Sequence, residues 1–281
     1  MSDWHPERLP SDEWAKLRPI IEEHILNQPR TLQKRIGPSE LGTDCVHCLA
    51  AKLAGWEHTP AKAAWIPYEG TCVHAAFEQL FDGHGYRTEL KVTVGRLDGQ
   101  DITGSVDLYD EESGTTVDWK TVGTTTLKAA KANGPSQQYL VQASLYGLGV
   151  RNAQRSVIVY LPRNAMTLDE AFSYEFTYDP RPGRWALNRA QVLLDMLDLI
   201  GRTDGPQVRD EWIRHLPRSF GRCFDCGTWV DDPVGNDPFG LDPHDTPSIE
   251  LPQRWTRLDH LVEPRYEGHL ANKETQPAQG K

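Results

Sequence analysis

The spacing of hydrophobic residues along the chain alternates between helical and strand-like, which predicts a mixed α/β fold. Apolar residues that recur every three or four positions predict helices, and β-branched runs between Gly- and Asp-rich turns predict strands. Helices are expected over residues 11–28, 49–56, 71–81, 136–148 and 185–200, and strands over residues 89–94, 102–109, 115–121, 156–161 and 172–178. The central order is therefore α-β-β-β-α-β, with three strands in a meander, followed by one more strand and one more helix.

The two ends of the chain differ from this central part. Ser11 is expected to cap the first helix and Pro29 to end it, while Pro19 within it favours a break. We expect an N-terminal helical segment over residues 1–36, a central domain over residues 37–226 and an acidic, flexible tail over residues 227–281.

Charge is distributed unevenly along the 281 residues. The chain has 40 Asp and Glu against 30 Lys and Arg, and this net charge of −10 argues against a protein that coats nucleic acid non-specifically. Residues 120–163 nevertheless contain six Lys and Arg and no Asp or Glu, whereas residues 225–281 contain eleven Asp and Glu and five Lys and Arg. The segment 120–163 is therefore the best candidate for a surface that faces an anion.

Two further features bear on location. No stretch has the roughly 18 uncharged apolar residues that a membrane span requires, and the first ten residues lack the apolar core of a signal peptide. We therefore expect a soluble, intracellular protein without a membrane partner. Five cysteines are too few for a disulfide scaffold, and in a reducing compartment paired cysteines more often bind metal.

The segment 104–120 predicts a β-hairpin that brings two carboxylates together. If residues 111–114 form a four-residue loop, counting back along both strands places Asp107 opposite Asp118. Lys120, two residues after Asp118, must then lie on the same face of the sheet, because side chains alternate between the two faces.

Such a trio predicts metal-dependent chemistry. Two carboxylates with Cβ atoms about 4.5–5.5 Å apart repel each other unless a positive charge lies between them. Hard oxygen ligands favour Mg²⁺ or Mn²⁺ over Zn²⁺, and a lysine beside the ion can orient the attacking water. Asp107, Asp118 and Lys120 thus predict a hydrolytic site for phosphodiesters. The plain alternative is an exposed ion pair on a strand surface, which contributes only ~0–1 kcal/mol.

Two helix faces offer side chains that would complete this site. His74 and Glu78 are four residues apart and share a face, so a neutral His74 imidazole can bind metal, whereas Glu78 is expected to face solvent. Gln142 and Tyr146 have the same spacing and offer an amide and a phenol that suit phosphate oxygens or a base edge. The alternative for each pair is ordinary packing between a helix and the sheet.

The ordered set of His74, Gly104-Ser-Val-Asp107, Asp118-Trp-Lys120 and Gln142-x-x-x-Tyr146 resembles the RecB-like branch of the PD-(D/E)XK nuclease superfamily. The likeness covers roughly residues 37–226 and is greatest to the CRISPR-associated RecB-like exonucleases and their bacteriophage relatives. It implies an α/β fold with a restriction-endonuclease-like αβββαβ core.

The resemblance also implies a role for each residue. The implied metal ligands are His74, Asp107, Asp118 and the backbone carbonyl of Trp119, and the implied catalytic residues are Asp107, Asp118 and Lys120. Gln142 and Tyr146 are implied to contact DNA. Basic residues such as Lys128 and Lys131 are expected to follow the phosphate backbone, so that binding weakens with salt.

Two Cys-x-x-Cys pairs, Cys45 with Cys48 and Cys223 with Cys226, supply four thiolates. Members of the resembled family often hold an iron–sulfur cluster between one early cysteine and three late ones, which implies a [4Fe–4S] cluster. The two-and-two arrangement in this chain makes tetrahedral Zn²⁺ the alternative. Either metal would act as a staple that closes the central domain. Cys72 is expected to be a small core residue.

The sequence thus predicts a metal-dependent DNA exonuclease that acts on single-stranded DNA or on duplex ends. The resemblance places it in DNA recombination, DNA repair or bacteriophage DNA metabolism, with a recombination protein as a candidate partner. Its expected location is the cytoplasm, which for a phage protein is that of the bacterial host cell. Two alternatives are a catalytically silent DNA-binding accessory protein and an endonuclease of the same superfamily.

Overall fold

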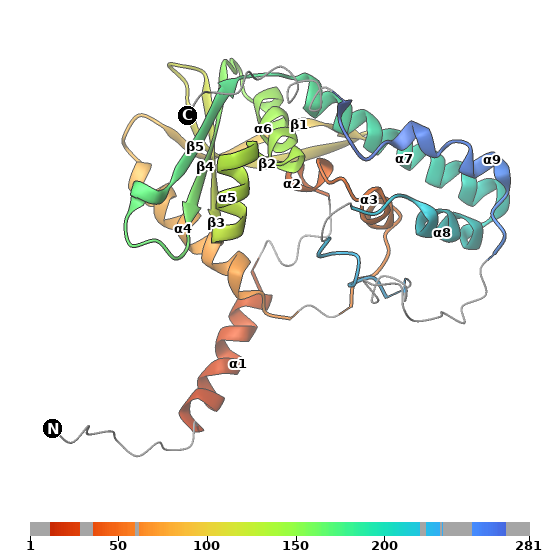
Figure 1. Cartoon of the computed structure of the whole chain (residues 1–281), viewed down its shortest axis with the longest axis horizontal. Coiled ribbons are helices and arrows are strands. Elements are labelled where there is room, and N and C mark those ends of the chain that lie inside the picture. Colours follow the sequence, from red (N-terminus) through yellow and green to blue (C-terminus); the bar gives the residue numbers. More distant parts are fainter. Residues whose placement is uncertain are drawn as a thin grey trace.

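The computed structural model of the chain describes residues 12–28, 36–59, 62–219, 223–230, 232 and 249–267 (Figure 1). A five-stranded sheet lies at one end of the molecule, and a group of helices lies at the other. Helix α6 (Gln137–Gly149) lies where the two parts meet.

The sheet confirms the predicted α/β class. Its strands, hydrogen-bonded in sequence order, are β1 (Arg87–Leu97), β2 (Gln100–Asp110), β3 (Thr115–Val122), β4 (Arg155–Pro162) and β5 (Phe172–Thr177). The first three pair antiparallel as a meander, β3 and β4 run parallel, and β5 runs antiparallel to β4. A parallel pair requires a crossover, which α5 (Thr124–Asn133) and α6 provide. With α4 (Trp65–Phe81) before β1, this is the predicted α-β-β-β-α-β order.

Helices pack on both faces of the sheet, because consecutive strand residues point in opposite directions. Trp119 of β3 points toward α4, where the rings of Phe77 and Phe81 lie 5.2 and 5.9 Å from it. The next residue, Lys120, points toward α6, where Gln142 accepts its hydrogen bond. The C-terminal end of helix α1 (Asp12–Leu26) meets the start of α4, where the rings of His24 and Tyr68 lie 5.7 Å apart (Figure 1).

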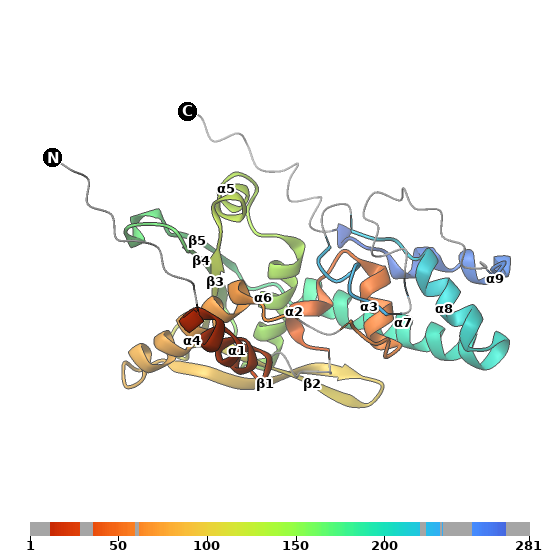
Figure 2. The same ribbon diagram turned by 90° about the horizontal axis from the view of Figure 1, so that it is seen from below.

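A β-bulge interrupts the long hairpin of β1 and β2 (Figure 2). The hairpin turns at Asp98 and Gly99, which both have the positive φ that a tight turn of this kind requires. The register then shifts by one residue between Thr93 and Gly95. This shift decides which residues of β1 face the candidate site.

The largest hydrophobic core lies beside the sheet, among α3 (Val46–Leu53), α6, α7 (Arg181–Asp204) and α8 (Pro206–His215). The amphipathic helix α7 buries Leu193 and Ile200 completely on its apolar side. Two short helices near the C-terminus, α9 (Gln253–Thr256) and η3 (Asp259–Val262), cover the same core. Trp255 and Val262 are buried there.

Arg189 on α7 ties distant segments of the chain together. It is only 3% exposed, and its guanidinium donates hydrogen bonds to the backbone carbonyls of Leu41, Thr43, Glu263 and Pro264. Leu41 is the last residue of the short helix α2 (Pro38–Leu41), so the bonds join the loop before α3 to the C-terminal segment. Carbonyl oxygens offset part of the cost of burying this cation, although burial still lowers the pKa of Arg189 to about 10.

Several helix boundaries differ from the predicted ones. Helix α4 begins at Trp65 rather than at residue 71, because Pro67 lies in its first turn, where the missing N–H costs no hydrogen bond. Pro19 lies inside α1 without ending it. Helices α5 and α8 were not predicted, and the threonines that open α5 explain its weak signal. The prediction that Cys72 is a core residue is wrong, since Cys72 is exposed on α4.

The predicted cap at Ser11 and stop at Pro29 lie outside the described residues, as does most of the predicted acidic tail. Within that predicted tail, the described residues 249–267 pack on the helices, and Trp212 of α8 donates a hydrogen bond of 2.9 Å to Asp259. The division of the chain at residues 36 and 226 stays a prediction. None of the described helices combines the length and apolar character that a membrane crossing requires.

Gly104 of β2 is expected to tolerate no larger side chain. An added Cβ would lie 2.8 Å from Cγ of Pro38 and 3.1 Å from Cε1 of Tyr146. Gly104→Ala should therefore lower the free energy of unfolding by about 1–3 kcal/mol. Gly70→Ala is the matched control, since an added Cβ on α4 meets no described atom within 4 Å and alanine stabilises a helix by about 0.5–1 kcal/mol over glycine. Urea unfolding followed by circular dichroism measures both, and equal effects would contradict the prediction.

Candidate metal centres

The first candidate site lies where β2 and β3 separate. The strands pair through Leu108 to Asp110 of β2, in the register that the predicted loop at residues 111–114 imposes. At the next residue of β2 the backbone ladder has ended. There, Oδ2 of Asp107 accepts a hydrogen bond of 2.7 Å from the Trp119 N–H. Asp107 and Asp118, 9% and 4% exposed, are both buried at this opening.

His74 reaches the opening from α4. Its Nδ1 lies 3.3 Å from Oδ1 of Asp107, and its Nε2 lies 3.0 Å from the carbonyl oxygen of Trp119. The ring thus contacts two of the groups that the sequence predicts as metal ligands. Burial works against protonation of the ring, but the hydrogen bond and charge of Asp107 raise the pKa of His74 above its usual value.

Lys120 is held by three neighbours. Its ammonium group lies 2.7 Å from Oδ2 of Asp118, donates a hydrogen bond of 2.9 Å to Oε1 of Gln142 and lies 4.8 Å from the centre of the Tyr139 ring. Gln142 in turn donates a hydrogen bond of 3.1 Å to the Tyr146 hydroxyl. Gln142 and Tyr146 are both buried, so they reach the site as supports of Lys120, and their contact with DNA stays a prediction.

The site carries more negative charge than Lys120 can offset. Burial and the charge of Asp107 raise the pKa of Asp118 to about 6, although Lys120 opposes both effects. Oδ1 of Asp118 is buried and has no hydrogen-bond partner among the described residues. A buried polar atom without a partner is costly, and a divalent cation is the partner that suits a carboxylate oxygen. The donors present, which are carboxylates, a carbonyl and an imidazole, fit Mg²⁺ or Mn²⁺.

The structure adds Glu89, which the sequence interpretation missed. Ligand atoms of His74, Glu89 and Asp107 all lie within 4.8 Å of one another. Nothing in the spacing of the strand predicted over residues 89–94 distinguishes this glutamate, because only the β-bulge turns it toward Asp107. A glycine in a strand is the usual sign of a bulge, so Gly95 is the one hint in the sequence.

The remaining predicted residues lie outside this cluster. Lys128 and Lys131 are exposed on α5, and Lys131 donates a hydrogen bond of 3.1 Å to the carbonyl of Glu170. Glu78 is exposed on α4, as the sequence suggests. A role for the two lysines in following a phosphate backbone stays a prediction.

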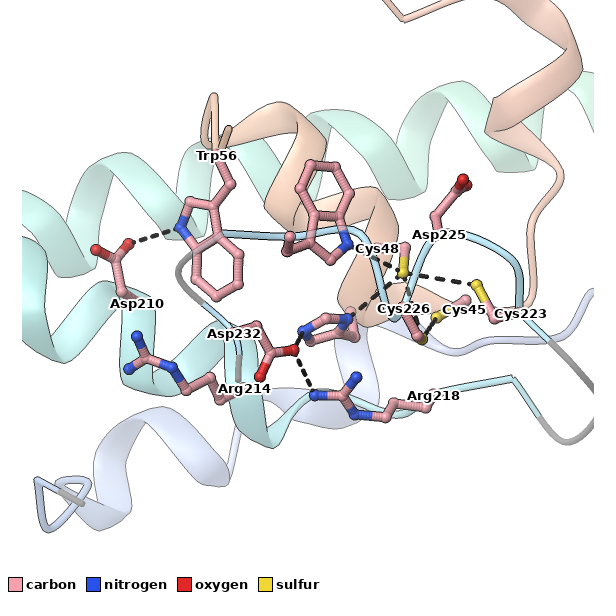
Figure 3. Close-up of polar contacts among 12 residues, drawn as sticks. Cys45, Cys48, Trp56, Asp210, Arg214, Arg218, Cys223, Asp225, Cys226 and Asp232 are labelled. Carbon is pink, nitrogen blue, oxygen red and sulfur yellow. Dashed lines mark hydrogen bonds and ion pairs between the residues drawn. The ribbon is translucent and has the colours of Figure 1, made fainter. Parts of the chain in front are cut away.

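The second candidate centre consists of the four paired cysteines, which meet beside α3 (Figure 3). Their sulfurs are joined by contacts of 3.5 Å from Cys45 to Cys226, 3.4 Å from Cys226 to Cys48 and 3.6 Å from Cys48 to Cys223. Hydrogen bonding with Cys223 raises the pKa of Cys48 and lowers that of Cys226. The four thiols therefore do not ionise together by themselves, and a bound cation is what would make all of them thiolates.

Buried polar groups surround these sulfurs. Trp229 Nε1 donates to Sγ of Cys48 at 3.4 Å, and Nδ1 of His47 lies 3.5 Å from the same sulfur. Nε2 of His47 lies 2.9 Å from Asp232, which also accepts a hydrogen bond of 2.7 Å from Arg218. Burial disfavours protonation, yet the Asp232 contact raises the pKa of His47. A protonated His47 offsets negative charge on the thiolates. The one feature of the sequence that indicates this role is the place of His47 between two cysteines.

Comparisons with known proteins do not assign the chain to a family. No family model matches it, and no curated protein matches it. Among solved structures it is similar to SSO0001, with 17% identity over 67% of this chain and 88% of that one and a TM-score of 0.41. It is also similar to the alkaline exonuclease LHK-Exo from Laribacter hongkongensis, with 14% identity over 60% of this chain and 94% of that one and a TM-score of 0.41. With LHK-Exo in complex with dAMP, the chain shares 14% identity over 61% of this chain and 93% of that one, with a TM-score of 0.44. Overlap of this extent does not decide function.

Asp118 should make the stability of the metal-free protein depend on pH. Its pKa is about 6 in the folded chain against an ordinary value of 3.8, so its neutral form favours folding. That contribution is complete below the ordinary value and is lost as pH rises through about 6. In the presence of EDTA, the free energy of unfolding in urea should therefore fall between about pH 4 and about pH 7, and Asp118→Asn should reduce the fall. An unchanged fall in the variant would contradict this.

Proposed function

We propose that the chain is a metal-dependent nuclease that hydrolyses phosphodiester bonds in DNA. One observation carries the proposal: two buried carboxylates meet at the end of a β-ladder, and one of them has an oxygen without a described partner. Lys120 and His74 adjoin them at 2.7 and 3.3 Å. Phosphodiester hydrolysis needs these groups, namely ligands for a hard cation and a positive side chain next to the reacting water.

In this proposal the chain's own residues hold and align the reactants. The residues that would hold Mg²⁺ or Mn²⁺ are His74, Asp107, Asp118 and the carbonyl of Trp119. Such an ion lowers the pKa of bound water and polarises the phosphate. Lys120 orients the attacking water and stabilises negative charge that develops on the phosphoryl oxygens. Gln142 accepts one of its hydrogen bonds and so limits the positions that the ammonium group can take.

DNA is the proposed substrate because of the motif resemblance and the charge of one segment. Residues 120–163 contain no acidic side chain, and they include Lys120 of β3 and the exposed lysines of α5. The resemblance favours an exonuclease that acts on DNA ends in recombination, repair or phage DNA metabolism. A silent DNA-binding protein is the weaker alternative, because binding alone does not require buried carboxylates that repel each other.

Lys120→Met and Asp107→Asn should each slow DNA hydrolysis at least roughly 100-fold, because one removes the group that orients water and the other a metal ligand. Release of acid-soluble nucleotide from end-labelled single-stranded DNA, with Mn²⁺ or Mg²⁺ and with EDTA, measures the rate. Lys16→Met on α1 is the control. Among the described residues Lys16 forms an ion pair with the exposed Glu13, away from the site, so this variant should hydrolyse DNA like the parent. The proposal fails if the parent protein leaves DNA intact with either metal.

A circular single-stranded substrate separates the two nuclease alternatives. An exonuclease needs an end, so the parent protein should degrade linear single strands and leave the circle intact. Conversion of the circle to linear fragments by the parent protein, but not by Lys120→Met, would instead identify an endonuclease.

We further propose that the four cysteines hold one tetrahedral ion, Zn²⁺, rather than a [4Fe–4S] cluster. Zn–S bonds of about 2.3 Å place the sulfurs of a tetrahedral site about 3.8 Å apart, close to the observed contacts of 3.4–3.6 Å. In a [4Fe–4S] cluster each cysteine binds a different iron, so the body of the cluster keeps the sulfurs out of contact. Sulfurs that touch one another therefore support a single ion.

The purified protein should contain about one zinc per chain, no iron and no acid-labile sulfide. Cys48→Ser should lose the zinc and lower the Tm by on the order of 10 °C, because the ion joins segments far apart in the chain. Cys72→Ser is the matched control, since Cys72 is exposed and lies outside the cysteine group, and it should change neither quantity. Elemental analysis and thermal unfolding provide the readouts. A brown protein with about four irons per chain would reject the single ion.

A further inference from the structure

Glu89 has an unusual backbone conformation that no turn explains. Its φ is 44°, and among the described non-glycine residues only Asp98 shares a positive φ. Asp98 lies in a two-residue hairpin turn that requires this conformation, whereas Glu89 lies within β1. A glutamate held in the left-handed region needs surroundings that favour it there, and such residues gather at functional sites.

The β-bulge places Glu89 level with Asp107. Near the turn, Leu97 pairs with Gln100, and continuing that register would put Glu89 opposite Leu108, on the wrong face. After the bulge, Leu90 pairs with Val106, so the residue before Leu90 lies across from Asp107. One extra residue in β1 therefore turns the Glu89 carboxylate to the face that carries the candidate site.

Two strands and a helix thus deliver ligand atoms to one point. Those of His74, Glu89 and Asp107 lie within 4.8 Å of one another. Ligands at about 2.1 Å from one ion are at most about 4.2 Å apart, so the group has nearly the size of a coordination sphere. Oδ1 of Asp118, on β3, is buried without a partner among the described residues. The charges of Asp107 and His74 act on the pKa of Asp118 and on that of Glu89.

Among the contacts of the described residues, Lys120 pairs with Asp118 and not with Glu89 or Asp107. Lys120 lies against Asp118, while Asp107 uses Oδ2 to accept the Trp119 N–H and directs Oδ1 toward His74. Glu89 and Asp107 are therefore two neighbouring carboxylates, and both lie close to His74. This arrangement has the donors for a cation on the β1 side of the opening, in addition to those predicted from the sequence.

We propose that Glu89 is a ligand of the divalent cation in the nuclease site. The proposal rests on the proposed function and extends it by one residue and one strand. With Glu89, the proposed protein donors are three carboxylates, an imidazole and the Trp119 carbonyl, which leave any remaining position to water or phosphate. A set with imidazole among hard oxygens binds Mn²⁺ more readily than Mg²⁺.

Mn²⁺ binding to the DNA-free protein tests this assignment, with free Mn²⁺ measured by electron paramagnetic resonance. Glu89→Gln should raise the Kd for Mn²⁺ at least roughly 10-fold, since loss of a ligand costs no less than loss of a group that supports one. Glu89→Gly should weaken binding as much, and glycine adopts the positive φ without strain, which guards against misfolding. Glu78→Gln removes an exposed carboxylate from α4 beside the site and should leave the Kd within about 2-fold.

A second readout separates a ligand from a structural residue. Without metal, Glu89→Gln should have the same Tm as the parent or a higher one, because it relieves repulsion with Asp107, and Mn²⁺ should raise its Tm less than that of the parent. A structural role predicts the opposite pattern, with a lower Tm and an unchanged response to Mn²⁺, and would overturn the assignment.

Asp107→Asn distinguishes failure of this inference from failure of the proposed function. If Asp107→Asn loses Mn²⁺ binding while both Glu89 variants bind like the parent, Glu89 is not a ligand and the nuclease proposal stands. If Asp107→Asn also binds Mn²⁺ like the parent, the nuclease site itself is misassigned and the Glu89 inference falls with it.

Discussion

The structure depends on how the chain accommodates carboxylates buried side by side where β2 leaves β3. Asp107 and Asp118 lie in a setting where water cannot screen their repulsion, and burial alone shifts Asp118 toward its neutral form. The neighbouring elements are arranged to answer this charge. β3 supplies Lys120 two residues after Asp118, α6 supplies Gln142 to hold the lysine, and α4 supplies His74. Because the sheet opens at Asp107, the carboxylate can accept a backbone N–H that would otherwise pair with a strand. These groups together offset only part of the negative charge, and the negative charge that remains makes the opening suited to a cation.

The cysteine centre, at the other end of the molecule, also brings together groups that repel each other when ionised, but its donors are sulfurs, which are softer than carboxylate oxygens. Cys45 and Cys226 are far apart in the sequence, yet their sulfurs lie 3.5 Å apart. A tryptophan donates its N–H to Cys48, and a ring nitrogen of a buried histidine lies 3.5 Å from the same sulfur. Asp232 links His47 to Arg218, so the charge of the histidine is itself supported (Figure 3). Such outer groups fix the orientation and the charge of ligands, and they matter nearly as much as the ligands do. Trp229 and Asp232 belong to the segment that composition alone assigns to an acidic tail, which shows how poorly net charge marks the end of a packed region.

The sequence predicts best what local geometry controls. The register of the β2–β3 hairpin follows from a four-residue loop, and that count suffices to bring Asp107 and Asp118 to one opening with Lys120. The order of strands follows from hydrophobic alternation and from the crossover that a parallel pair requires. Glu89 is different, because its direction depends on a bulge four residues or more along the strand, and one inserted residue reverses the face of everything beyond it. His47 is different for another reason: its partner Asp232 is far away in the chain, and no periodicity connects them.

Helix α2 connects the two centres through contacts at both of its ends. Pro38, at the start of this helix, packs against Gly104 at the beginning of the Gly-x-x-Asp sequence, and Tyr146 approaches the same glycine from α6. At the other end of α2, Arg189 donates hydrogen bonds to the carbonyls of Leu41 and Thr43, and Thr43 lies two residues before Cys45. A continuous path of close contacts therefore runs from Gln142 and Tyr146, which support Lys120, through α2 to the backbone that precedes Cys45. The loop before Cys45 and the residues that support Lys120 therefore belong to one closely packed region, whose parts cannot shift independently without opening voids.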